Sequence, residues 1–147
     1  MHDATPFRIP GKVIDYDFIT RVLADEAQGM NIARIFYDPW RINDLERSLA
    51  HAGVSMPLEA CGQGMKSMSP AIESFEVLAK PGKLRHGNHP VLRWCFANAM
   101  VERDAAANRK PDKSKPYGRI DVAVAALMAI AAMKNATDPL EVATLIA

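Results

Sequence analysis

The stretch "NIARIFYDPWRINDLERSLAHAG", residues 31–53, decides the fold class. Its first seven residues form a short run of apolar and β-favouring residues, which predicts a buried strand over 31–37. The remainder predicts a helix over 39–53, because Pro39 takes the tolerated first helical position and Gly53 follows the end. A strand followed directly by a helix is the building unit of α/β proteins.

The same alternation continues on both sides of this stretch. A helix is expected over residues 14–29, where apolar residues recur at helical spacing (Ile14, Phe18, Ile19, Val22 and Leu23). Downstream we expect a strand over 56–63, a helix over 69–82 with Ser69 as its cap, a short edge strand over 83–87, a helix over 89–102 capped by Asn88, a polar loop over 103–118 and a long helix over 119–136. Strands that alternate with helices predict an α/β fold whose partly parallel sheet has helices on both faces.

Composition limits the class of protein without selecting a function. The chain has 147 residues, which suits one domain, and its 49% apolar and 24% charged residues are ordinary for a globular protein. A net charge of +1 does not by itself favour a nucleic-acid partner. Cys61 and Cys95 are far apart in sequence and form no CxxC pair, which fits a reducing cytoplasm. The opening residues lack the apolar core of a signal peptide, and the apolar run near 120–133 is too short to span a bilayer.

Two aspartates at the ends of predicted elements are the candidate site residues. Asp38 follows the first strand, at the end where parallel sheets form ligand crevices, and it also precedes a helix that it could cap. Asp121 opens the last, apolar helix, where its charge suits the helix dipole. Each aspartate is therefore either a cap or a metal ligand. Together they could hold Mg²⁺ or Mn²⁺, ions that promote phosphodiester cleavage.

A basic loop precedes Asp121. Between Arg103 and Arg119 lie several cations with few acids among them (Arg109, Lys110, Lys113 and Lys115). Cations beside a metal site would hold a DNA backbone, whereas the alternative is a solvated loop without a partner.

The other polar motifs are weaker. His86 and His89 lie three residues apart, but the sequence has no further Cys or His nearby at zinc-ligand spacing, so the pattern does not match a zinc site. Trp94 and Asn98 share one helix face; we expect Trp94 in the core, while Asn98 could orient a site or pack between helices. The glycines of "GQGMKSMSP" do not match the P-loop pattern.

Four sequence blocks, in order, carry a resemblance to a known family. They are "YDPW", "GQG" followed by "SP", "HPVLRW" followed by an asparagine, and "RID" followed by an alanine-rich helix. Over roughly residues 8–134 the chain resembles the C-terminal nuclease domain of the large terminase subunit of tailed bacteriophages and prophages. The spacing of all four blocks makes the resemblance specific.

This resemblance implies a ribonuclease H-like mixed sheet flanked by helices and an endonuclease that cuts concatemeric DNA during genome packaging. It implies two bound Mg²⁺ or Mn²⁺ ions, with Asp38 of "YDPW" and Asp121 of "RID" as catalytic metal ligands. Lys110, Lys113, Lys115 and Arg119 would then bind DNA. The implied partners are double-stranded DNA, the rest of the large subunit with its ATPase motor, the small subunit and the portal, in the cytoplasm of a bacterial host.

The chain also departs from the family pattern. The family carries a further catalytic aspartate on the first strand of its sheet, upstream of the matching region. We therefore expect residues 13–135 to form a partial nuclease domain without its first strands, between an irregular lead-in (1–12) and a C-terminal tail (136–147). The alternative functions are an inactive prophage remnant or a DNA- or protein-binding module of the same fold, and an unrelated α/β enzyme that uses His86 and His89.

Overall fold

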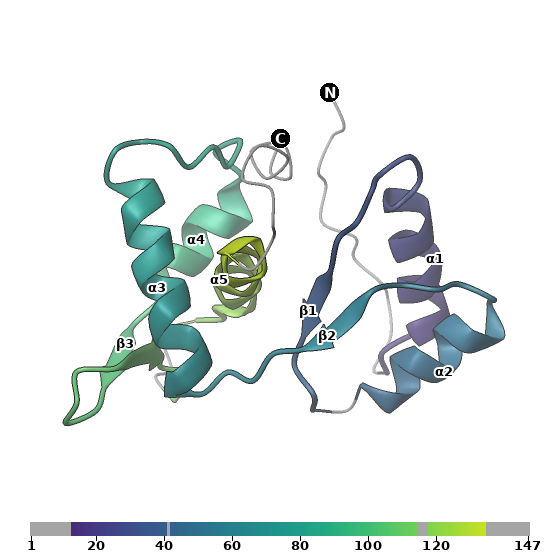
Figure 1. Cartoon of the computed structure of the whole chain (residues 1–147), viewed down its shortest axis with the longest axis horizontal. Coiled ribbons are helices and arrows are strands. Elements are labelled where there is room, and N and C mark those ends of the chain that lie inside the picture. Colours follow the sequence, from purple (N-terminus) through teal and green to yellow (C-terminus); the bar gives the residue numbers. More distant parts are fainter. Residues whose placement is uncertain (1–12, 41, 115–117, 135–147) are drawn as a thin grey trace.

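The computed structural model describes residues 13–40, 42–114 and 118–134 (Figure 1). Along the chain its elements are α1 (Tyr16–Glu26), β1 (Ile35–Tyr37), α2 (Asn43–His51), β2 (Leu58–Ala60), α3 (Met65–Ala79), α4 (Pro90–Asn98), β3 (Val101–Arg103), β4 (Arg109–Pro111) and α5 (Asp121–Lys134). The α/β order expected from the sequence is confirmed. The predicted lead-in, the predicted tail and Lys115 lie outside the described residues.

The parallel pair β1–β2 is the centre of the fold. Ile35 lies opposite Leu58 and Tyr37 lies opposite Ala60, and α2 makes the crossover between the two strands. Figure 1 shows this pair between α1 and α2 on one side and α3, α4 and α5 on the other. Parallel strands require such a crossover and cover on both faces, which is why the helices flank them.

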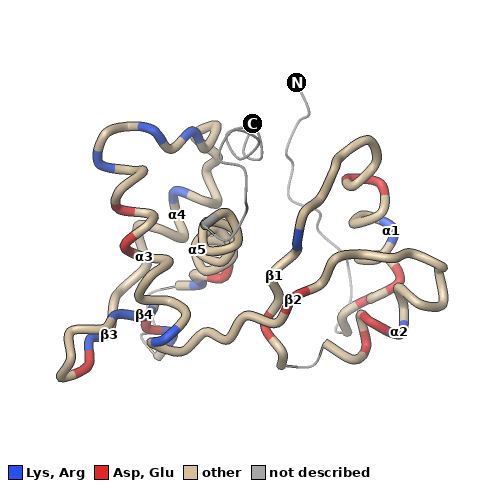
Figure 2. The backbone as a smooth tube through the Cα atoms, in the orientation of Figure 1, with Lys and Arg blue, Asp and Glu red and all other residues tan. Residues whose placement is uncertain are grey.

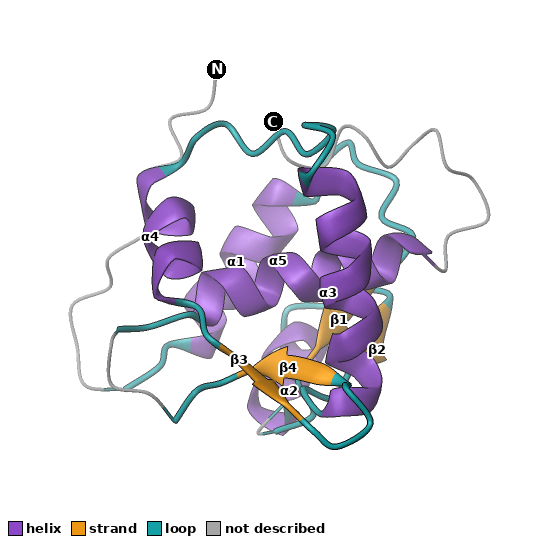
Figure 3. Ribbon diagram, turned by 90° about the vertical axis from the view of Figure 1, so that its left-hand side faces the viewer, coloured by secondary structure: helices purple, strands orange, loops and turns teal. Residues whose placement is uncertain are grey.

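The main core lies where α3, α5 and the strands meet. Its buried cluster consists of Cys61, Met68, Ile120, Val124 and Met128, with Phe36 and Ala99 packed against it. Met68 is fully buried, and burying a side chain of this size contributes roughly 1.5–3 kcal/mol. The view in Figure 3 shows α3 crossing in front of α5. The nearly all-apolar sequence of α5 follows from this position between neighbouring elements.

A second contact joins α1 to α2 through buried hydroxyl groups. Thr20 donates from Oγ1 to Oγ of Ser48 at 2.9 Å, and Ser48 donates to Oδ1 of Asp17 at 2.5 Å. The carboxylate of Asp15 caps α1 by accepting a 2.8 Å hydrogen bond from the backbone N–H of Phe18. The two hydroxyl bonds satisfy polar groups that would otherwise be costly to bury.

The region after α3 differs from the sequence prediction. Residues 83–87 form no strand, because Gly82 ends α3 in a left-handed conformation (φ 69°) and the amides of Lys83 and Leu84 donate to the carbonyl of Leu78. Amides already bonded to helix carbonyls are unavailable for sheet pairing.

Helix α4 ends at Asn98, so the predicted helix over 89–102 is too long. A hairpin spans the last residues of that prediction and the first part of the predicted polar loop over 103–118. Strands β3 and β4 pair antiparallel, with Val101 opposite Pro111 and Arg103 opposite Arg109. Asp104 closes the turn, since Oδ1 accepts from the backbone N–H groups of Ala106 and Asn108. A turn stabilised by its own aspartate gives the hairpin despite the polar sequence.

Three predicted helix starts are also wrong. Helix α2 begins at Asn43 and not at Pro39, and α3 begins at Met65, which places Pro70 inside the helix and makes Ser69 a buried helical residue. Tertiary burial of Met68 extends α3 upstream and outweighs the local preference of proline for the first turn. Asn88 has a φ of 56°, which a helix N-cap does not adopt, and His89 takes that position.

Candidate functional site

Asp38 lies directly after β1, at the carboxyl end of the parallel pair. Its Oδ1 accepts a 3.1 Å hydrogen bond from the backbone N–H of Trp40, which closes an Asx turn. The aspartate does not cap α2, because that helix begins only at Asn43 and its preceding residue makes no side-chain cap. Of the two interpretations of Asp38, the helix cap is therefore wrong.

Gln63 fixes the other oxygen of this carboxylate. Its Nε2 donates to Oδ2 of Asp38 at 2.6 Å, and the backbone N–H of Cys61 donates to the carbonyl of Tyr37 at 2.8 Å. The ends of β1 and β2 are thus joined by one backbone and one side-chain bond. The sequence interpretation missed Gln63. Gln63 is the last residue of the second predicted strand, and the carboxyl ends of parallel strands lie at the same edge of a sheet. This position could have indicated that Gln63 lies near Asp38.

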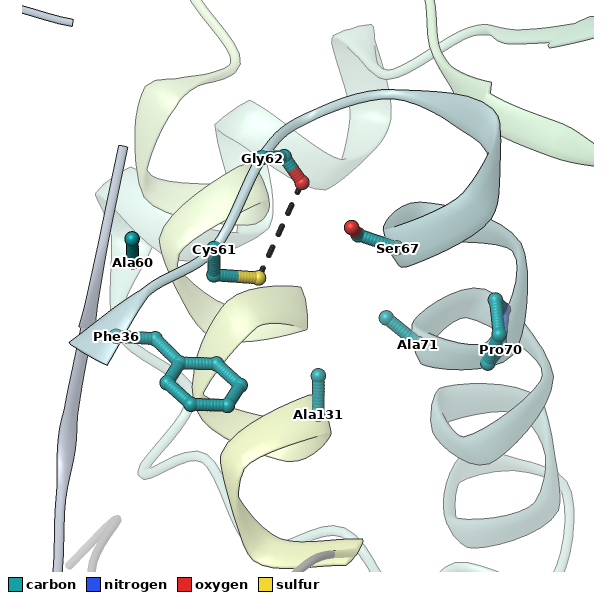
Figure 4. A pocket seen from close by; sticks show the side chains of 8 residues that line it. All are labelled: Phe36, Ala60, Cys61, Gly62, Ser67, Pro70, Ala71 and Ala131. Atoms are coloured by element: carbon teal, nitrogen blue, oxygen red, sulfur yellow. Dashed lines mark hydrogen bonds between the residues drawn. The ribbon is translucent and has the colours of Figure 1, made fainter. Parts of the chain in front are cut away.

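A small pocket lies behind this edge (Figure 4). It has a volume of about 300 Å³ and lies between β1, the residues that follow β2, and helices α3 and α5, with Phe36, Cys61, Ser67 and Ala131 among its lining residues. Burial raises the pKa of the Cys61 thiol, and the negative charges of Glu59 and Asp38 raise it further. Cys61 is therefore a neutral core thiol at pH 7 and not a nucleophile.

Asp121 is the first residue of α5, and its side chain is 67% exposed. The ammonium Nζ of Lys113 lies 3.9 Å from Oδ1 of Asp121. Immediately before it, Ile120 is buried in the main core and fixes the start of the helix. The burial of Ile120 therefore fixes the backbone position of Asp121, whose carboxylate lies at the surface beside Lys113.

The same hydrophobic cluster anchors both aspartates. Phe36 precedes Asp38 by two residues and packs against the cluster that contains Ile120, the neighbour of Asp121. Helix α5 contacts β1 directly. Across the part of the chain that the structure describes, no three or more His, Cys, Asp or Glu side chains gather as a metal-binding group. The described residues thus offer two anchored carboxylates, each at the end of an element.

The predicted DNA-binding residues have different surroundings. Lys110 pairs with Glu102 across the hairpin at 3.1 Å, and Lys113 lies beside Asp121. Arg119 is exposed and makes no ion pair with any other described residue. Figure 2 shows basic residues on the β3–β4 hairpin and beside α5. Arg119 and Lys113 are the cations nearest in sequence to Asp121 among the described residues.

Helix α4 packs against the chain that enters α5. Gly118 has a φ of 126°, and a Cβ there would lie 2.8 Å from Nδ2 of Asn98 and 3.0 Å from Cζ2 of Trp94. No hydrogen-bond partner for the buried amide Nδ2 of Asn98 is found among the described residues. Trp94 is 51% exposed, so its predicted place in the core is wrong, although its Cζ2 edge lies close to Gly118. Trp94 and Asn98 share one face of α4 because they are four residues apart, and this face lies against Gly118.

The two histidines do not form a zinc site with other described residues. His86 lines a larger pocket of about 610 Å³ between α3, α4 and α5, which is otherwise mostly apolar. His89 is the residue before the first turn of α4. Because the described residues place neither histidine in a group of possible metal ligands, the hypothesis of an unrelated enzyme that uses His86 and His89 gains no support.

The chain is similar to proteins of one known family. The family model described as "Terminase large subunit, endonuclease domain" matches residues 8–137. Over 123 residues the chain is 43% identical to the large terminase subunit of Enterobacteria phage HK97, which covers 84% of this chain and 24% of that protein. Over 127 residues it is 28% identical to Protein YmfN of Escherichia coli (strain K12), a match that covers 82% of this chain and 26% of that protein. The chain thus spans about a quarter of the length of these curated relatives.

Two solved structures share the fold. The crystal structure of the HK97 bacteriophage large terminase aligns with a TM-score of 0.78 at 43% identity, over 84% of this chain and 26% of that one. The large terminase nuclease from thermophilic phage G20c aligns with a TM-score of 0.59 at 15% identity, over 82% of this chain and 62% of that one. At this identity the match is evidence for the fold and not for the function. The ribonuclease H-like α/β fold expected from the sequence is confirmed. None of the helices within the described residues is long and apolar enough to cross a membrane.

Proposed function

This chain belongs to the family of terminase large-subunit endonuclease domains, and from that premise we propose that it is a divalent-metal-dependent endonuclease acting on double-stranded DNA. The observation that carries the proposal is the shared anchoring of Asp38 and Asp121 on one hydrophobic cluster, through Phe36 and Ile120. Its role would be to cut concatemeric DNA during genome packaging in the cytoplasm of a bacterial host, together with the small subunit and the portal.

The chemistry of the two carboxylates fits Mg²⁺ or Mn²⁺. Each oxygen of Asp38 accepts one hydrogen bond and keeps a second lone pair, and Asp121 is exposed with the ammonium of Lys113 3.9 Å away. Magnesium is commonly bound by one or two carboxylates and several waters, so Asp38 and Asp121 would be its protein ligands in this proposal. A bound ion would activate water for attack on a phosphodiester and neutralise the leaving oxygen.

The remaining residues have supporting roles in this proposal. Gln63 holds the Asp38 carboxylate in one orientation, which matters because a ligand free to rotate binds a metal less tightly. Lys113 and Arg119 would contact phosphates near Asp121 and hold the strand. Lys110 would contribute less, because Glu102 already pairs with it. Lys115 stays a sequence prediction.

Cleavage of supercoiled plasmid tests the proposal. The purified chain is incubated with Mn²⁺, with Mg²⁺ and with EDTA, beside Asp38→Asn and Asp121→Asn. We expect metal-dependent nicking in the wild type and a loss of roughly a hundredfold or more in both variants, because each would remove a charged metal ligand. Asp25→Asn, on the exposed surface of α1, is the matched control and should cleave like the wild type.

Two results would overturn the proposal: no nicking by the wild type in either metal, or unchanged nicking by both aspartate variants. DNA binding that weakens with salt, without any cleavage, would instead identify the second candidate function, a DNA-binding module of the same fold. The exposed cations Arg119 and Lys113 are the observation that favours this candidate.

A further inference from the structure

Trp94 has an exposure that packing alone does not explain. The indole is 51% exposed on the surface of α4, although tryptophan normally buries most of its large apolar area. Its Cζ2 edge is fixed against Gly118, where an added Cβ would lie only 3.0 Å away. The ring is therefore held in place at one edge while half of it stays accessible to solvent.

Cations lie near this held ring. Arg119 follows Gly118 directly, so its Cα is about 3.8 Å from the Cα of the glycine that Trp94 contacts. Lys113 is 3.9 Å from Asp121, which in turn is only three residues beyond Gly118. Residues 118–121 therefore run from the contact with the indole of Trp94 to the contact with the ammonium of Lys113, and they include Arg119. We call Trp94, Arg119 and Lys113 together the α5-entry surface.

We propose that the α5-entry surface binds the DNA strand next to Asp121, with the indole of Trp94 packed on a sugar or base and Arg119 and Lys113 on phosphates. This inference rests on the proposed function, because it assigns the substrate contact of that same site. An aromatic ring among exposed cations matches a nucleic acid, which has stacking surfaces and one negative charge per phosphate. An apolar protein partner would leave Arg119 without a counter-charge.

The first test measures DNA affinity in EDTA, where cleavage cannot interfere, by fluorescence anisotropy of a labelled duplex and a labelled single strand. Trp94→Ala should weaken binding by roughly tenfold with an unchanged salt dependence, and Trp94→Phe should recover most of the affinity because the aromatic ring remains. Arg119→Gln should instead lower the slope of log affinity against log salt by about one. Arg85→Gln, an exposed arginine in the loop between α3 and α4, is the control of equal charge and should have a smaller effect.

The second test reads Trp94 directly. The chain has two tryptophans, so in Trp40→Phe the emission comes from Trp94 alone. DNA should quench that emission in proportion to bound protein, with binding of the Trp40→Phe chain followed independently by anisotropy. This readout needs no mutation of Trp94 and so does not depend on whether Trp94→Ala folds.

The inference is overturned if DNA leaves the Trp94 emission unchanged, or if folded Trp94→Ala binds DNA as tightly as the wild type. Its failure is separable from failure of the proposed function. Quenching of the Trp94 emission and weaker DNA binding by Trp94→Ala, without any cleavage by the wild type, would support DNA binding at the α5-entry surface and reject the nuclease activity. Metal-dependent cleavage without quenching of the Trp94 emission would support the nuclease activity and reject DNA binding at the α5-entry surface.

Discussion

Gln63 donates a hydrogen bond of 2.6 Å from Nε2 to Oδ2 of Asp38, across the ends of the two parallel strands. The bond leaves the carboxylate only one orientation, since Oδ1 is held at the same time by the backbone N–H of Trp40. A carboxylate fixed at both oxygens is pre-organised for a ligand beyond the strand ends.

Replacing Gln63 should therefore reduce metal-dependent cleavage without unfolding the chain. Gln63→Ala is expected to lower cleavage by roughly tenfold to a hundredfold and to raise the Mn²⁺ concentration needed for half activity, as outer partners of metal ligands do. Titrating Mn²⁺ in the plasmid assay measures both effects. Gln28→Ala, at an exposed position after α1, is the control; equal activity of the two variants would show that the bond does not matter.

Gly118→Ala should destabilise the fold. The alanine would need a backbone φ of 126°, which residues other than glycine rarely adopt, and its Cβ would lie 2.8 Å from Nδ2 of Asn98. The expected loss in unfolding free energy is roughly 1–3 kcal/mol, measured by urea unfolding. Gly62→Ala should cost less, because no atom lies within 4 Å of a Cβ there and its φ is not in the left-handed range.

A double variant separates the two causes of that loss. Adding Asn98→Ala to Gly118→Ala removes the crowding atom but not the backbone strain, so part of the stability should return. If the double variant is as unstable as the sum of both single changes, the contact between Asn98 and Gly118 does not contribute.

The ion pair between Glu76 and Arg109 should make stability depend on acid pH. Two hydrogen bonds of 2.6 and 3.3 Å join them and hold the β3–β4 hairpin to α3. The hydrogen bonds from Arg109 lower the pKa of Glu76, helped by the charges of Arg109, Lys80 and Arg103, while burial acts in the opposite direction. A lowered folded-state pKa stabilises the fold above the ordinary glutamate pKa of about 4.3, and this stabilisation is lost as the pH falls through the lowered value.

The measurement is the difference in unfolding free energy between the wild type and Glu76→Gln across pH. It should be constant near neutral pH and shrink below about pH 4.3. Glu46→Gln, on the exposed surface of α2, is the control. A difference that stays constant down to strongly acid pH would show that the pair does not couple protonation to folding.

The hydroxyl chain between α1 and α2 should show strong non-additivity. Ser48→Ala removes both bonds of Ser48 and leaves the buried Thr20 hydroxyl without its acceptor, at an expected cost of about 1–3 kcal/mol. Adding Thr20→Val removes that stranded hydroxyl, so the double variant should be closer to the wild type than Ser48→Ala alone. Urea unfolding of all four proteins measures the coupling, and simple additivity would contradict it.

Local sequence was sufficient for the order of the main elements. The apolar run over 31–37 contains β1 and the apolar segment over 119–136 contains α5, because both signals lie within one continuous segment. The ordered blocks around Asp38 and Asp121 were also sufficient for the family. The boundaries at Pro39 and Pro70 were wrong, since local proline preferences were outweighed by packing elsewhere in the chain.

The contacts that define the candidate site depend on the tertiary structure. Gln63 reaches Asp38 across 25 positions of sequence, and Trp94 meets Gly118 only because α4 packs against the chain that enters α5. Hydrophobic periodicity describes which residues one element buries, and it contains no information on which distant side chain faces which. The sequence by itself therefore determined the α/β order and gave the two aspartates as candidate site residues, whereas only packing around the cluster of Met68 and Ile120 decided how each carboxylate is held and what surrounds it.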